Sequence, residues 1–155
     1  MIKVFLVEDE IIIRNGIKNS INWEMHGYDF VGEASDGELA LPMILEKKPD
    51  ILITDIKMPF MDGLELSKHA LALYPDLRVV IISAHENFSY AQTAIHLGVY
   101  EYLLKPIQPQ ELNNILQKVL SSIKEQHLQK RLDSMTANYA KNHLLLQLIQ
   151  GSTLT

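Results

Sequence analysis

Short runs of apolar and β-branched residues alternate with helix-patterned segments along the first 123 residues, and this alternation constrains the fold most. The expected strands are Ile2–Val7, Phe30–Ala34, Ile51–Thr54, Val79–Ser83 and Tyr100–Leu104. The expected helices that follow them are Ile11–Ile21, Gly37–Glu46, Leu64–Leu73, Ser89–Leu97 and Pro109–Ile123. Strict alternation predicts an α/β fold, a doubly wound parallel sheet covered by helices on both faces, because parallel crossovers are right-handed.

The charge balance and the N-terminal sequence argue against several classes of protein. The chain has 155 residues, a formal net charge of −5 and no cysteine. Nucleic-acid binding by this segment alone is not expected, because phosphate contacts need clustered Lys and Arg. The sequence shows no signal peptide and no apolar run of membrane-spanning length. We therefore expect a cytoplasmic protein without a membrane partner.

A different pattern begins after Ile123. From Lys124 to Gln150 there is no Gly and no Pro, and a seam of residues steps by four and three. The seam residues are Leu128, Leu132, Met135, Tyr139, Asn142, Leu146 and Ile149. Such a heptad seam is typical of a dimer-forming coiled coil, in which Asn142 would restrict the register, but it also suits a solvent-exposed linker helix.

The expected fifth helix has a seam of its own, out of phase with the later one. Its residues are Leu112, Leu116, Val119 and Ile123, and the next step, to Leu128, is five residues long. This phase change predicts a bend or a change of packing partner near residues 125–127. We expect a domain over residues 1–124, a helical linker over 125–150 and a flexible end over 151–155 after a helix stop at Gly151.

Polar residues lie at the carboxyl ends of four of the five expected strands. Glu8 and Asp9 follow the first strand, Asp55 the third and Lys105 the fifth, and Ser83 ends the fourth. The carboxyl ends of parallel strands meet at one edge of the sheet, where ligands bind. Three clustered carboxylates repel one another, and a hard divalent ion such as Mg²⁺ would compensate them with oxygen ligands.

Taken one at a time, these residues also have purely structural explanations. Glu8 or Asp9 could cap the first helix, Ser83 could cap the fourth, Asp55 could close a loop and Lys105 could be a surface lysine. Their joint placement at the ends of several strands favours a functional site over a set of independent structural roles.

The stretches around these positions resemble the receiver domain of two-component response regulators. The matching stretches are Val7-Glu8-Asp9-Glu10, Asp55-Ile56-Lys57-Met58-Pro59, Met61-Asp62-Gly63, Ile82-Ser83-Ala84 and Leu104-Lys105-Pro106, within residues 1 to about 122. The resemblance implies a flavodoxin-like (βα)₅ fold. It also implies that Asp55 accepts a phosphoryl group from a phosphohistidine on a sensor histidine kinase.

The same resemblance implies a role for each site residue. Asp9, Asp55 and the backbone carbonyl of Lys57 would bind Mg²⁺, with Glu8 acting through a bound water. Lys105 would neutralise the charge that develops during transfer, which suits a reaction that depends on positioning and electrostatics. Ser83 would bind the attached phosphoryl group and Tyr102 would be the switch aromatic. Pro106 would follow a cis bond.

The region from Ser83 to Ala91, with Leu97-Gly98-Val99, resembles a subgroup of receivers that carry an AraC-type helix-turn-helix domain downstream. This implies a transcription regulator that contacts DNA only through a domain absent from these 155 residues. We expect a homodimer, formed through the tail seam and the face around the fourth and fifth helices.

Two other classes of protein can be weighed against this interpretation. A haloacid-dehalogenase phosphatase needs a second aspartate two residues after its nucleophile, and that position is Lys57. We therefore expect no enzyme beyond catalysis of its own phosphorylation and dephosphorylation. The alternative is a constitutive dimerisation scaffold with a receiver fold, which would not need Glu8, Asp9, Asp55, Ser83 or Lys105.

Overall fold

In the computed structural model, the backbone is described for residues 1–84 and 87–153, and the side chains of these segments as far as Leu148. Five strands form one parallel sheet in the order β2-β1-β3-β4-β5. They are β1 (Ile2–Val7), β2 (Tyr28–Ala34), β3 (Ile51–Asp55), β4 (Arg78–Ser83) and β5 (Glu101–Leu104). This is the flavodoxin-like order, so the predicted fold class is confirmed.

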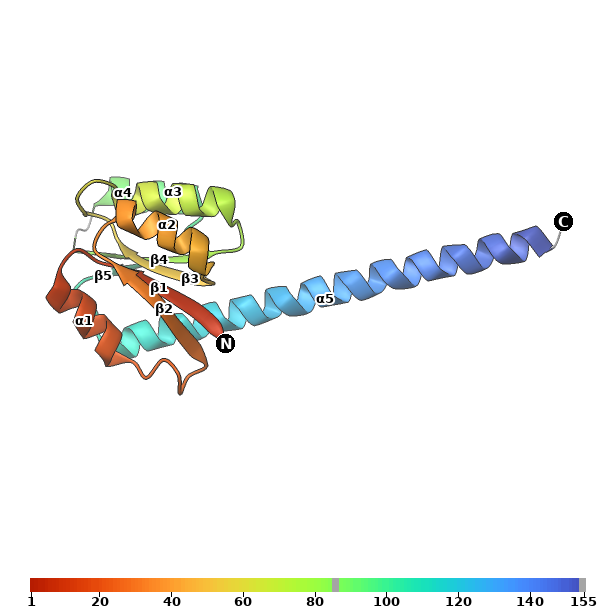
Figure 1. Ribbon diagram of the computed structural model, residues 1–155, viewed down its shortest axis with the longest axis horizontal. Coiled ribbons are helices and arrows are strands. Elements are labelled where there is room, and N and C mark those ends of the chain that lie inside the picture. The colour runs from red at the N-terminus through yellow and green to blue at the C-terminus, as the bar shows by residue number, and fades with distance from the viewer. Residues whose placement is uncertain (85–86, 154–155) are drawn as a thin grey trace. The chain divides into compact units, whose positions relative to one another are not determined.

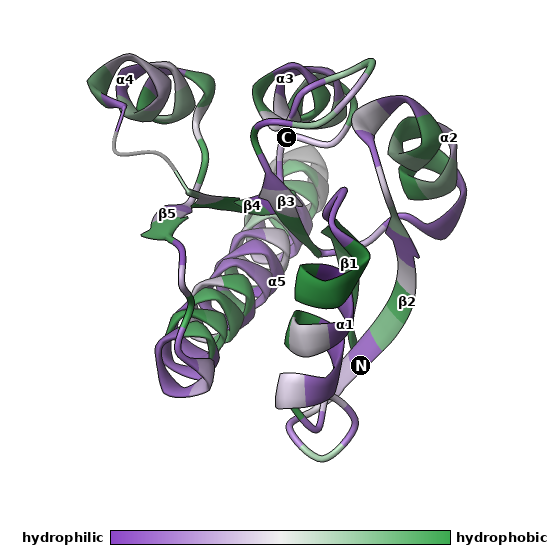
Figure 2. Cartoon of the chain, turned by 90° about the vertical axis from the view of Figure 1, so that its left-hand side faces the viewer, coloured by the Kyte–Doolittle hydropathy of each residue, from purple (hydrophilic) through white to green (hydrophobic). Residues whose placement is uncertain are grey.

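The helices cover both faces of this sheet. They are α1 (Ile11–Ser20), α2 (Gly37–Lys47), α3 (Gly63–Leu73), α4 (Phe88–Leu97) and α5 (Pro109–Thr153). Figures 1 and 2 show α2, α3 and α4 on one face, with α1 and the first turns of α5 on the other. Three helices begin at a side-chain cap, at Asp36, Asp62 and Asn87, which each accept a backbone N–H of the first turn.

The strands alternate their side chains between two buried layers, as a sheet covered on both faces requires. Phe5 and Val7 of β1 join the apolar cluster that includes Ile44 of α2 and Leu66 of α3. Val4 and Leu6, with the opposite orientation along the strand, are also fully buried. Each large apolar side chain buried in this way contributes about 1.5–3 kcal/mol to folding.

The strand register places the functional positions side by side. Val7 of β1 pairs with Thr54 of β3, so the residues that come next, Glu8 and Asp55, lie at the same level at the edge of the sheet. In the same way Ser83 pairs with Leu104, one residue before Lys105. The order of the strands reverses at β1, between β2 and β3, which is where ligand sites occur in open parallel sheets.

The chain divides into two compact units, Met1–Val119 and Leu120–Thr155. Helix α5 is continuous through residues 125–127, where the sequence predicted a bend or a change of packing, and through Gly151, where it predicted a stop. A glycine costs a helix only about 1 kcal/mol relative to alanine, so it does not by itself end one. The proposed division at residues 124 and 150 stays a prediction.

The seam residues of the tail expose their side chains. All six between Leu128 and Leu146 are exposed, whereas Leu112, Leu116, Val119 and Ile123 are buried. The side chain of Ile149, the seventh seam residue, lies outside the described part of the structure. The periodic apolar pattern therefore continues where burial within this chain has ended.

None of the described helices combines the length and the apolar character that crossing a membrane requires.

Candidate functional site

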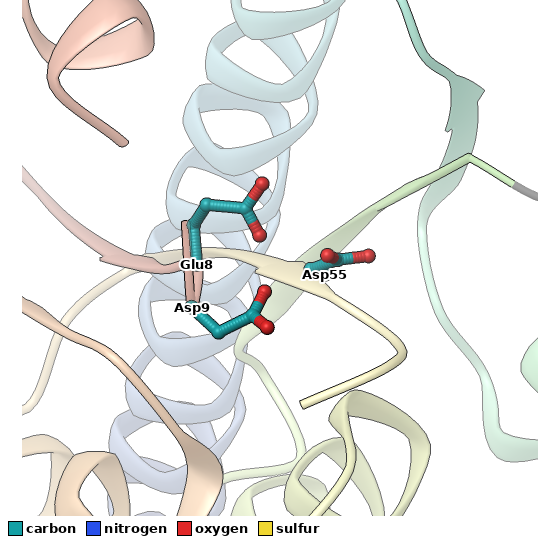
Figure 3. A group of neighbouring side chains, drawn as sticks. All are labelled: Glu8, Asp9 and Asp55. Atoms are coloured by element: carbon teal, nitrogen blue, oxygen red, sulfur yellow. The ribbon is translucent and has the colours of Figure 1, made fainter. Parts of the chain in front are cut away.

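Three carboxyl groups meet beyond the ends of β1 and β3. One ligand oxygen each from Glu8, Asp9 and Asp55 lies within 4.8 Å of the other two. Figure 3 shows Glu8 and Asp9 extending from the end of β1 toward Asp55. Glu8 and Asp55 are buried and Asp9 is exposed, so the cluster borders solvent on the side of Asp9.

Lys105 supplies the positive charge at this cluster. Its Nζ donates to Glu8 Oε1 at 2.5 Å and to Asp55 Oδ2 at 3.0 Å. Its backbone N–H donates to the carbonyl of Ser83 at 2.8 Å, and the bond to Pro106 is cis, as the resemblance implied. Burial lowers the pKa of Lys105, but the hydrogen bonds to Glu8 and Asp55 outweigh it and the pKa is raised.

The surroundings of Glu8 disfavour the ionised form of its carboxyl group, in spite of the neighbouring Lys105. Burial, followed by the neighbouring Asp55, raises its pKa from 4.5 to about 8, although Lys105 acts in the opposite direction. Its second oxygen, Oε2, is buried and has no hydrogen-bond partner among the described residues. Three carboxylates with an unpartnered buried oxygen fit a hard divalent cation, which takes oxygen ligands and compensates the repulsion.

Asp55 is held by its own backbone neighbours. The N–H of Ile56 donates to Asp55 Oδ1 at 2.7 Å, while Lys105 occupies Oδ2. The hydroxyl of Thr54 donates to the carbonyl of Asp55 at 2.9 Å. That carbonyl lies against the start of α3, because a Cβ built on Gly63 would be 1.8 Å from its oxygen. Only glycine allows α3 to begin so close to Asp55.

The loop between β3 and α3 carries Lys57 and is fixed by backbone hydrogen bonds. Gly63 N–H donates to the carbonyl of Ile56 at 2.8 Å, and Gly37 N–H at the start of α2 donates to that of Met61 at 3.2 Å. Between them, Met61 N–H donates to the Pro59 carbonyl at 2.9 Å, which closes a three-residue turn around Phe60. Lys57 is exposed within this loop.

Phe60 adopts a backbone conformation that bulky residues rarely occupy. Its φ is 69° and its side chain is 82% exposed. The turn that it centres has the φ of the classic γ-turn, a strained form. Because the ring is largely exposed, burial compensates little of the strain.

Phe60→Gly is therefore expected to raise the free energy of unfolding by about 1 kcal/mol, since relief of strain exceeds the entropic cost of glycine. Urea unfolding followed by circular dichroism measures the change. Phe60→Ala is the control, because it removes the ring and keeps a Cβ at positive φ, and it should leave stability nearly unchanged. Equal stabilisation by both variants would mean that the ring, and not the backbone, is unfavourable.

The observed helix caps bear on the capping explanation for Glu8, Asp9 and Ser83. The residue that precedes α1 is Glu10, which makes no side-chain capping bond, and Asn87 caps α4. Capping therefore does not account for Glu8, Asp9 or Ser83. Ser83 is fully buried at the end of β4, and Tyr102 on β5 packs partly buried against the apolar cluster.

One residue at the site was missed by sequence reasoning. Arg14 of α1 donates from Nη1 to the backbone carbonyl of Glu8 at 2.7 Å. An arginine among polar residues of an amphipathic helix ordinarily lies on the solvated face, so no local pattern marks it.

The raised pKa of Glu8 predicts a pH dependence of folding. Between pH 4.5 and about 8 the folded protein holds a proton on Glu8 that the unfolded chain releases. The unfolded state therefore binds fewer protons, so the contribution of Glu8 to the free energy of unfolding falls as pH rises through this window. Urea unfolding in EDTA at pH 5.5 and pH 8 measures it.

Glu8→Gln is the control for this pH dependence, because it keeps the shape and removes the titration. The variant should lose less stability than wild type between the two pH values. Identical losses would show that Glu8 does not hold the proton.

Comparisons with known proteins agree on one family. A family model described as the response regulator receiver domain matches residues 4–117. The uncharacterized transcriptional regulatory protein YesN of Bacillus subtilis is 38% identical over 159 residues, which cover 97% of this chain and 43% of YesN. The chain spans about half the length of the curated relatives it matches, or less.

Solved structures show the same likeness. The REC domain of AraT, a response regulator from Geobacillus stearothermophilus, superimposes with a TM-score of 0.76 at 43% identity, over 81% of this chain and 97% of that domain. A two component transcriptional regulator AraC from Clostridium phytofermentans gives a TM-score of 0.73 at 32% identity, over 83% of this chain and 99% of that one.

Proposed function

The chain belongs to the response-regulator receiver domains of two-component systems, and on this premise we propose that Asp55 is its phosphoacceptor. The observation that carries the proposal is the pairing of Lys105 Nζ with Asp55 Oδ2 beside two further carboxylates. This arrangement combines a fixed nucleophile, a fixed cation and oxygen ligands for a divalent metal. Phosphoryl transfer needs these three elements and little other chemistry.

In the proposed reaction a carboxylate oxygen of Asp55 attacks the phosphorus of a phosphohistidine on a sensor histidine kinase. The new O–P bond forms as the N–P bond breaks, and the imidazole leaves. Asp9, Asp55 and the carbonyl of Lys57 would hold Mg²⁺, with Glu8 reaching it through a water. The metal would neutralise charge on the phosphoryl oxygens. Lys105 stays protonated and neutralises the same charge from its own position.

After transfer, Ser83 would donate its hydroxyl hydrogen to a phosphoryl oxygen, and Tyr102 would respond by moving inward. Support comes from their placement, since Ser83 is buried at the end of β4 and Tyr102 lies on the adjacent strand, where Ile81 pairs with it. A small change at the site would in this way alter the face formed by α4, β5 and the start of α5.

Incubation with acetyl phosphate and Mg²⁺, followed by intact-mass measurement, tests the proposal. One added phosphoryl group, absent when EDTA replaces Mg²⁺, is the expected result. A chain that stays unmodified would favour the alternative, a constitutive dimerisation scaffold.

The proposal also includes a downstream effector domain and a second copy of the chain. The phosphorylated domain would act in the cytoplasm and control a downstream transcription-regulating domain of the AraC type, which alone would contact DNA. The relatives support this, because YesN and HptR are named as transcriptional regulatory proteins and the protein from Clostridium phytofermentans is named as a transcriptional regulator AraC. The tail would join two copies of the chain through its exposed seam.

The tail seam makes a measurable prediction about dimerisation. Leu132→Asn is expected to weaken self-association at least about 10-fold in sedimentation velocity, because a seam residue buries its side chain in a coiled coil. Leu144→Asn is the matched control, since Leu144 is also exposed but lies outside the seam. Equal effects of the two variants, or a monomeric wild type at high micromolar concentration with Mg²⁺ and a phosphoryl mimic, would contradict the prediction.

A further inference from the structure

We propose that Arg14 is a positioning residue, which holds the loop bearing Glu8 and Asp9 and thereby sets the affinity of the site for Mg²⁺. The inference rests on the proposed function of the carboxylate cluster. The guanidinium group of Arg14 connects α1 to two other elements. Nη1 donates to the Glu8 carbonyl at 2.7 Å, and Nε donates to Glu33 Oε1 on β2 at 3.2 Å.

The loop between β1 and α1 is short, and hydrogen bonds hold the backbone on both sides of Glu8. Only residues 8–10 connect β1 to α1. The N–H of Glu8 donates to the carbonyl of Ala34 on β2 at 3.1 Å, and the carbonyl of Glu8 accepts from Arg14. The second bond constrains the peptide that joins Glu8 to Asp9. The orientation of this peptide decides the directions in which both carboxylates leave the backbone.

Glu33 in turn orients Arg14. Hydrogen bonding from Lys18 and then from Arg14 outweighs burial and lowers the pKa of Glu33, so its carboxylate stays ionised. The side chain of Arg14 is only 14% exposed, which shields its bonds from water. A planar guanidinium can satisfy a carboxylate and a carbonyl at once with fixed geometry, which a lysine ammonium does less well.

Lys18 offers a matched comparison within the same helix. Its Nζ pairs with the other oxygen of Glu33, Oε2, at 2.8 Å, and its side chain is 46% exposed. Among the described residues the structure records no bond from Lys18 to the loop over 8–10. Both residues therefore neutralise Glu33, and only Arg14 also holds the backbone beside the carboxylates.

Arg14→Met and Lys18→Met test the inference on the full chain. Arg14→Met should raise the dissociation constant for Mg²⁺, measured by isothermal titration calorimetry, about 10-fold, the scale on which residues behind metal ligands act. Lys18→Met should change it less than about 2-fold. In the metal-free protein, the ¹³C carbonyl resonance of Glu8 should shift in the Arg14 variant and stay in place in the Lys18 variant.

The rate of phosphorylation by acetyl phosphate distinguishes a positioning role of Arg14 from a loss of folded protein. In Arg14→Met the Mg²⁺ concentration for half-maximal rate should rise in proportion to the dissociation constant, while the rate at saturating Mg²⁺ returns to within about 3-fold of wild type. Partial unfolding would instead lower the saturating rate. If Arg14→Met does not fold, Glu33→Gln serves in its place, because it loosens Arg14 and should raise the dissociation constant about 3-fold.

Equal Mg²⁺ affinities in the wild-type protein and the Arg14→Met and Lys18→Met variants would overturn the positioning role while leaving the phosphoacceptor proposal intact. A wild-type protein that neither binds Mg²⁺ nor becomes phosphorylated would instead refute the proposed function itself.

Discussion

Asp55→Asn is expected to abolish phosphorylation by acetyl phosphate, a fall of at least about 10³-fold in the rate of labelling, because an amide is not a nucleophile. Among the carboxylates of this edge in the described part of the chain, Asp55 is the one that accepts a backbone N–H on one oxygen and the Lys105 ammonium on the other. Asparagine keeps the size of the side chain. The loss should therefore occur in a protein that remains folded, as circular dichroism will verify.

Asp9→Asn is the control for the acceptor assignment. It removes a carboxylate from the same cluster but leaves Asp55 and Lys105 in place. This variant should still be labelled when Mg²⁺ is raised, because the change weakens metal binding and not the nucleophile. Labelling of Asp55→Asn at the wild-type rate would place the phosphoryl group elsewhere.

Gly63→Ala is expected to cause the largest loss of stability of the substitutions discussed, about 3 kcal/mol in the free energy of unfolding. The new Cβ would lie 1.8 Å from the carbonyl oxygen of Asp55 and 3.1 Å from the Cα of Ile56. Both are backbone atoms, so the start of α3 must move away from β3. The displacement would also disturb Asp55, and phosphorylation should fall with stability. Urea unfolding and labelling by acetyl phosphate measure the two effects.

Gly16→Ala provides the matched control in another helix. A Cβ at Gly16 meets nothing within 4 Å, and the residue lies inside α1. Alanine there should increase the free energy of unfolding by about 0.5–1 kcal/mol, because glycine is the poorer helix former. A Gly63 variant as stable as wild type would mean that α3 shifts without cost and that the close approach to Asp55 is not required.

The positions of the strands could be predicted from the sequence, because the residue pattern that indicates a strand lies within one short segment. The buried strand at residues 51–55 begins with three apolar residues and continues through the β-branched Thr54, and the observed strand ends one residue later than expected. The start of β2 was missed by two residues. Tyr28 is buried at its first position, with its ring edge-on to Trp23, but the exposed Asp29 interrupts the apolar run.

In the tail, the change of seam phase marks a change in burial and not an interruption of the helix. The phase change after Ile123 predicted a bend or a change of packing partner near residues 125–127. Helix α5 continues through these residues without interruption, while burial changes, because Ile123 is buried and Leu128 is exposed. Backbone hydrogen bonds depend on helix propensity and on the absence of proline, and neither changes there. The phase of the seam governs only which side of the helix another surface would cover.

The sequence by itself determined the five strand–helix units and the polar residues at the strand ends, because both follow from the period and composition of short segments. Only the tertiary structure decided which of those residues touch. Lys105 reaches Glu8 across 97 residues and Asp55 across 50, and Arg14 meets Glu33 across 19. Such contacts depend on strand order, on register and on the close approach at Gly63. These are properties of segments packed against each other, which no single segment encodes.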